Sequence, residues 1–120
     1  MRTNAGRDFQ SAQMGGTPGA AANFMGVTAN ATAASAASTA LTGEVASGTL
    51  IRAVATYFHT AGTTTYTLSK TFTSDQTIQI EKIGIFNAST AGTLVFETAL
   101  NAPAALISGD SLAITETVTI

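Results

Sequence analysis

The chain has 120 residues, a formal net charge of −2 and no cysteine, which excludes disulfide bonds and thiolate metal sites. Only 10% of its residues are charged, against about a quarter in most soluble domains. They form no basic patch, so we expect no electrostatic binding of nucleic acid. No apolar run approaches the ~20 residues that span a bilayer, so we expect no membrane partner.

So few charges protect a surface poorly against association. We therefore expect other subunits to cover much of it. The alternative is a small threonine-rich domain that is polar without being charged. Residues 1–8 lack the apolar core of a signal peptide, which predicts synthesis and assembly in the cytoplasm.

Residues 1–21 contain a Gly15-Gly16 pair and Pro18 but few large apolar side chains. Proline ends helices, and the segment has too few apolar groups for a core of its own. We predict an extended N-terminal arm that a neighbouring subunit orders; a disordered leader is the alternative. The predicted partner interface consists of Arg2, Arg7, Phe9, Met14, Phe24 and Met25.

Residues 22–120 are predicted to form a single β domain. Residues 22–28 are a strand candidate, and the alanine, serine and threonine run to residue 40 predicts a loop, with a helix as the alternative. Residues 50–58 are apolar on both faces, which suits a strand covered on both sides. Residues 65–73 place apolar side chains on one face and threonines on the other, typical of an amphipathic strand.

Residues 77–98 are the most apolar and β-branched stretch and predict a hairpin that turns at residues 87–92. The apolar phase slips within the first strand, which predicts a β-bulge near Glu81-Lys82.

The end of the chain predicts two further strands. Residues 101–103 predict a turn because Pro103 cannot donate to a ladder, and residues 104–107 predict a short edge strand. Residues 111–120 predict the last strand, again with alternating apolar side chains and threonines.

Short strands separated by polar turns predict an all-β fold, an antiparallel β-sandwich or barrel. Three charged side chains, Arg52, Lys70 and Glu116, fall in apolar rows of these strands. An unpaired charge on an apolar face is costly, so we predict that Glu116 pairs with Arg52 or Lys70, or that these faces meet a neighbouring subunit. Solvation of these charges at strand edges is the alternative.

A catalytic site needs a nucleophile with a base, a carboxylate pair or a metal cluster. His59 is the only histidine, and the acidic residues are scattered without metal-ligand spacing. We therefore expect no enzymatic activity, no cofactor, no metal and no small-molecule substrate.

The order of several motifs carries a family resemblance. They are IEKIGIFN at residues 80–87, GTLVFE at 92–97, SGDSL at 108–112 and TETVTI at 115–120. This order is similar to segments of tailed-bacteriophage tail-collar and tail-fibre proteins and resembles small virion structural proteins.

The resemblance implies a non-enzymatic structural protein on the surface of a phage particle. A β module with an N-terminal arm suits a capsid decoration (cement) protein that binds the major capsid protein and forms a homotrimer with copies of itself. A tail or tail-fibre attachment protein is the alternative, and a phage-encoded enzyme or carbohydrate-binding domain is a third reading.

Overall fold

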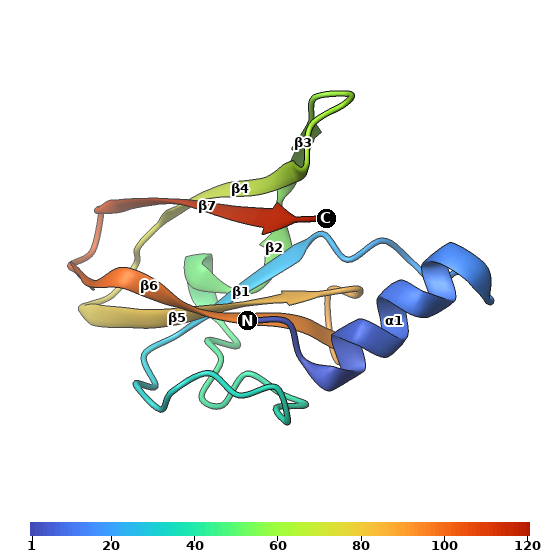
Figure 1. Cartoon of the computed structure of the whole chain (residues 1–120). Coiled ribbons are helices and arrows are strands. Elements are labelled where there is room, and N and C mark those ends of the chain that lie inside the picture. The colour runs from blue at the N-terminus through green and yellow to red at the C-terminus, as the bar shows by residue number, and fades with distance from the viewer.

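The strands of the computed structural model, which describes all residues 1–120, form two antiparallel sheets facing each other (Figure 1). Sheet A has the strand order β2-β1-β5-β6, and sheet B has the order β3-β4-β7. The strands are β1 (Phe24–Thr28), β2 (Ala53–Val54), β3 (Thr56–His59), β4 (Thr65–Thr73), β5 (Ile78–Phe86), β6 (Leu94–Leu106) and β7 (Ser111–Thr119). The fold is therefore mainly β, as predicted, and is consistent with a sandwich; it is not a barrel.

The predicted hairpin of residues 77–98 is confirmed, because β5 and β6 pair antiparallel with Ile85 opposite Phe96. The predicted bulge is confirmed too, but its extra residues lie on β6. Residues 100–103 of β6 face Glu81 alone, between the pairs that flank them. The predicted turn at residues 101–103 is wrong. Because β6 is an edge strand, a proline inside a bulge does not break the sheet.

Side chains from both sheets fill the core, and the predicted alternation is confirmed in β4 and β7. Leu68 and Phe72 of β4 are 1% and 2% exposed, and Ile114 and Val118 of β7 are also buried. Met25 of β1 is fully buried in the same cluster. Its assignment to a partner interface is therefore wrong, because β1 is an inner strand of sheet A.

The prediction of one strand over residues 50–58 is wrong. A 3-10 helix, η1 (Gly48–Leu50), comes first, and the chain then passes from β2 in sheet A to β3 in sheet B. The crossing falls at Ala55, which is buried and donates its N–H to the carbonyl of Asn23 at 2.7 Å.

The extended N-terminal arm is also a wrong prediction, because residues 4–15 form the helix α1 (Asn4–Gly15). Thr3 caps the helix by accepting the N–H of Gly6 at 2.9 Å. Met1–Thr3 pair with β6, where the N–H of Thr3 donates to the carbonyl of Val95 at 3.0 Å. The segment is therefore folded onto its own chain, and α1 lies at the end of the sandwich where β6 begins (Figure 1).

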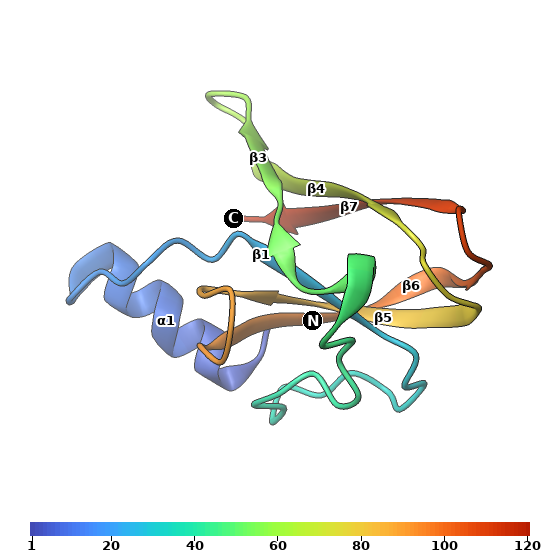
Figure 2. The ribbon, with the colours of Figure 1, turned by 180° about the vertical axis from the view of Figure 1, so that it is seen from behind.

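Residues 29–47 cover the outer face of sheet A, on the side away from sheet B (Figure 2). As predicted, the alanine, serine and threonine run in this segment is a loop rather than a helix. The glycines Gly26 and Gly84 lie opposite each other in this face. A methyl group on Gly26 would overlap the side chain of Glu44, and one on Gly84 would crowd Leu41. These two glycines let the loop approach the sheet closely.

Candidate functional site

The outer face of sheet B consists of the side chains of β3, β4 and β7 that point away from the core, and we call it the threonine face. Its members are Thr56, Phe58, Thr65, Thr67, Ser69, Thr71, Thr73, Ser111, Ala113, Thr115, Thr117 and Thr119. None of them is charged, and none is buried. In contrast to the outer face of sheet A, no segment of the chain lies over it (Figure 1).

Large apolar side chains are exposed where the chain passes between the sheets. Val54 on β2 is 54% exposed, and Tyr57 and Phe58 on β3 are 60% and 64% exposed. The hairpin of β3 and β4 also projects beyond the sandwich (Figure 2). Phe58 belongs to the threonine face, whereas Tyr57 points to the opposite face of sheet B and Val54 belongs to sheet A. We call these three residues the apolar edge, because they lie together where the chain passes between the sheets, and such exposed patches mark contact sites with other molecules.

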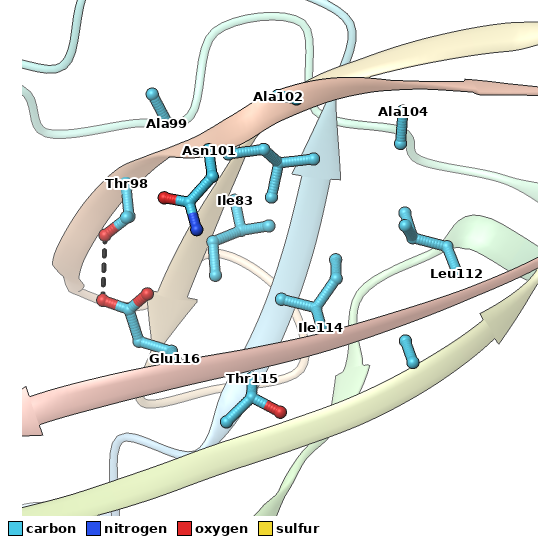
Figure 3. Close-up of a pocket in the computed structure, with 12 residues that line it drawn as sticks. Ile83, Thr98, Ala99, Asn101, Ala102, Ala104, Leu112, Ile114, Thr115 and Glu116 are labelled. Atoms are coloured by element: carbon cyan, nitrogen blue, oxygen red, sulfur yellow. Dashed lines mark hydrogen bonds between the residues drawn. The ribbon is translucent and has the colours of Figure 1, made fainter.

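A groove of about 300 Å³ lies between β6 and β7, where the two sheets are open at one side (Figure 3). We call it the seam groove. Ile83, Leu100, Leu112 and Ile114 are the large apolar side chains of its lining, and the other apolar residues there are alanines. Asn101, in the bulge of β6, points its amide toward β7 (Figure 3).

Glu116 lies at one end of the seam groove. The hydroxyl of Thr98 donates to its Oε1 at 2.9 Å and joins β6 to β7 there (Figure 3). Burial raises the pKa of the Glu116 carboxyl, and this hydrogen bond and the N-terminal ammonium oppose the rise only in part. No cation lies within 4.0 Å of this carboxylate, since both ion pairs of the chain involve other residues.

The predicted pairing of Glu116 with Arg52 or Lys70 is therefore wrong within the chain. Lys70 lies opposite Ile114, and its Nζ is 5.8 Å from the ring centroid of Phe72. Arg52 precedes the crossing at Ala55, so it lies with sheet A and pairs with Glu44.

Arg52 forms the most highly connected polar cluster of the chain. Its Nε donates to Glu44 Oε2 at 2.8 Å, and its Nη2 donates to Glu44 Oε1 at 2.6 Å. Its Nη1 donates to the carbonyls of Ala88 and Ala91 at 3.0 and 2.7 Å. The guanidinium also lies 3.4 Å from the ring centroid of Phe86. This cluster holds the loop, the crossing segment and the β5–β6 turn together, which is a structural role.

A second buried pair, Lys82 with Glu97, was not foreseen from the sequence. Nζ of Lys82 donates to Glu97 Oε2 at 3.0 Å, and both side chains are 3% exposed. Burial alone would raise the pKa of Glu97, but hydrogen bonds from Ser35, Lys82 and Ser38 outweigh it and lower that pKa. The strand pairing could have indicated the pair, because it places Lys82 and Glu97 as diagonal neighbours on the covered face of sheet A.

The other residues predicted at a partner interface are divided between the interior and the surface. Phe9 packs on the main core and Phe24 on a smaller cluster with Leu41. Arg2 lies over the ring of Phe96 at 5.7 Å. Arg7 is exposed and Met14 is 89% exposed, and for these two the interface remains a prediction.

A second hollow, of about 530 Å³, separates α1 from sheet B and has no charged side chain in its lining. The polar side chains of its lining are amides and phenols, from Gln10, Gln13, Asn23, Tyr57 and Tyr66. The two tyrosine rings are tilted, with centroids 5.5 Å apart. Burial raises the pKa of Tyr66, which therefore stays neutral at physiological pH. We call this hollow the aromatic pocket.

His59, the one histidine of the chain, closes a turn. Its Nδ1 donates to the carbonyl of Thr65 at 2.8 Å across the β3–β4 hairpin. No group of three or more His, Cys, Asp or Glu side chains is placed to hold a metal ion. The helices of the structure are all too short or too polar to cross a bilayer. No protein-family model matches the chain, and no curated protein matches its sequence.

Proposed function

We propose that the protein is a non-enzymatic structural component of a tailed-phage virion, a decoration protein that binds the major capsid protein on the outer shell and stabilises it. The observation that carries this proposal is the threonine face, a three-stranded surface with no charged side chain and no covering segment. The motif order described above supports the phage setting.

A face without charges is suited to repeated protein contacts, because no charged group has to be removed from water when the face is covered. At ~25 cal/mol per Å², each ~100 Å² of apolar surface buried contributes ~2.5 kcal/mol before ordering costs. Such a contact is weak for one copy but strong when many copies, grouped as homotrimers, act on one shell.

The contact is assigned to the threonine face and its apolar edge rather than to a free arm. Residues 1–15 are folded against β6, where they already satisfy their hydrogen bonds. Releasing them to reach a neighbour would expose Phe9 and the edge of β6 to water.

The variant Thr117→Lys tests this assignment. Thr117 lies on the threonine face, opposite Thr67 of the central strand β4, so a lysine there places a charge in the proposed contact. We expect its affinity for purified particles to fall about tenfold or more, because an unpaired charge would be buried. Thr32→Lys, in the exposed loop, is the matched control and should bind as the natural protein does. Equal binding of both variants would exclude the threonine face.

Attachment in the tail is the second candidate, and the aromatic pocket favours it. Aromatic rings and amides without charges are suited to a neutral polyhydroxylated ligand such as a surface glycan. The two functions differ in copy number. A stained gel of purified particles should show the protein in amounts comparable to the major capsid protein if it decorates the shell, and in few copies if it belongs to the tail.

A further inference from the structure

The two strand edges that meet at the seam groove differ in how they are protected. Met1–Thr3 cover the first part of β6, and the bulge with Pro103 interrupts the rest of that strand. Bulges and prolines of this kind prevent an edge from pairing with another chain. The edge of β7 has neither, since its pairing with β4 runs without a shift from Ser111 to Thr119.

The unpaired backbone groups of β7 can be assigned from its hydrogen bonds. The N–H of Ile120 donates to the carbonyl of Thr64 at 2.8 Å, so even-numbered residues face β4. In an antiparallel ladder the alternate residues then face away. The outward groups belong to Ser111, Ala113, Thr115, Thr117 and Thr119. Of these groups, only the carbonyl of Thr119 has a hydrogen-bond partner, Nη2 of Arg2, which donates to it at 3.4 Å.

The side of the groove that an added strand would meet is apolar, with one acidic end. Leu112, Ile114 and Glu116 are the inward side chains of this part of β7. Glu116 has a hydroxyl partner but no cation, although its carboxyl is half-buried. The titratable groups around it are the Met1 ammonium, which donates to Thr98 Oγ1 at 3.3 Å, and two diagonal neighbours on β4, the Tyr66 phenol and Lys70. Lys70 Nζ lies 5.8 Å from the ring centroid of Phe72, and none of the three forms an ion pair with Glu116.

We propose that the edge of β7 from Ser111 to Thr117 accepts an extended segment of a partner protein as an added antiparallel strand, with a Lys or Arg of that segment paired to Glu116. Strand addition supplies main-chain hydrogen bonds, and alternate side chains that enter the groove supply specificity. The inference goes beyond the proposed function, because it assigns a second surface and names the chemistry that the surface recognises.

A second copy of this chain fits the edge less well. Pairing two β7 strands antiparallel around Thr115 would satisfy every outward group. It would also make the two Glu116 carboxylates diagonal neighbours on the same half-buried face, where like charges destabilise the pairing. A basic partner segment turns that repulsion into an attraction.

The test uses two acetylated, amidated heptapeptides and no virus particle, so its failure is distinct from failure of the proposed function. The first, Thr-Lys-Thr-Val-Thr-Val-Thr, places its lysine opposite Glu116 and its valines opposite Ile114 and Leu112 when it pairs antiparallel. In the second, glutamate replaces the lysine. Amide NMR titration of the labelled protein measures both affinities and locates the site.

We expect the lysine peptide to bind about tenfold more tightly than the glutamate peptide, with shifts concentrated in β7. Glu116→Lys should reverse this order, and Glu116→Gln should abolish the difference, which covers the case in which the lysine variant does not fold. Thr115→Pro removes an outward N–H and no bond to β4, so it should weaken both peptides, whereas Thr115→Val should not.

Three results would overturn the proposal. The first is equal affinity of the two peptides, or binding of neither. The second is unchanged binding by Thr115→Pro. The third is a concentration-dependent dimer of the natural protein that Thr115→Pro abolishes, because a second copy would then occupy the edge.

Discussion

Arg52 shows how much one side chain can organise in a chain with so few charges. It connects Glu44 in the covering loop, its own segment before the crossing, and the turn carbonyls of Ala88 and Ala91. Ala91 itself has a positive φ of 50°, a conformation that costs energy for a residue other than glycine. The hydrogen bond from Arg52 to its carbonyl helps to hold that turn in place.

The variant Arg52→Lys tests this role. Lysine keeps the charge but cannot form the fork to Glu44 and both carbonyl bonds at once. We expect a loss of about 2 kcal/mol in the free energy of unfolding, measured by urea denaturation, because hydrogen bonds to charged groups contribute about 1.5–3 kcal/mol each. Arg7→Lys, on the exposed side of α1, is the matched control. A loss below about 0.5 kcal/mol at Arg52 would show that the cluster adds little.

At the scale of elements, the docking of α1 is the largest departure from what the sequence predicts. The helix packs on β6 at Gly6, which is buried, and a methyl group at this position would overlap the main-chain carbonyl of Val95. Backbone cannot move aside as a flexible side chain can. The close approach of helix and strand therefore depends on this glycine.

Two glycine-to-alanine variants in the same helix separate docking from helix propensity. Alanine at Gly6 gains propensity but clashes, so Gly6→Ala should lower the free energy of unfolding by about 1–3 kcal/mol. Gly15 has no other atom near its would-be methyl group, so Gly15→Ala should be neutral or raise stability by up to about 1 kcal/mol. Thermal unfolding and proteolysis of residues 1–20 measure both. Equal stability of the two variants would mean that the docking is loose.

At the scale of the whole molecule, the response to pH follows from two carboxyls that shift in opposite directions. The pKa of Glu97 lies below the ordinary value of 4.5, so its stabilising contribution is present above pH 4.5 and is lost as the pH falls through the lowered pKa. The pKa of Glu116 is raised above 4.5. The Glu116 carboxyl therefore holds its proton more tightly in the folded protein than in the unfolded chain. The free energy of unfolding decreases as the pH rises through that raised pKa.

We therefore expect the contribution of these two groups to stability to be largest near pH 4.5. Urea denaturation between pH 3 and 8 measures it. Glu116→Gln should flatten the decline on the alkaline side and leave the protein at least as stable as the natural one at pH 7. Glu97→Gln should be destabilised at pH 7, with the difference shrinking in acid. A loss of stability by Glu116→Gln at pH 7 would contradict this assignment.

The strands that the sequence determined are those whose partners lie close by or whose faces alternate cleanly. Tyr66, Leu68 and Phe72 between threonines define the buried face of β4, and the same alternation defines β7. The slip in apolar phase near Glu81 located the bulge, and the turn residues at 87–92 located the hairpin. In each case the signal lies in the local sequence: a period of two residues marks the strands and the bulge, and residues that favour turns mark the hairpin.

Only the tertiary structure decided which distant groups meet. In the tertiary structure α1 packs on β6 at Gly6, and the chain crosses from one sheet to the other at Ala55. Strand β6 continues past Pro103 instead of ending there. The tertiary structure also paired Arg52 with Glu44, and it placed no cation within ion-pair distance of Glu116. The physical reason is that these contacts depend on strand register and on how closely residues far apart in sequence can pack. The alternation of side chains within one segment contains no information about either.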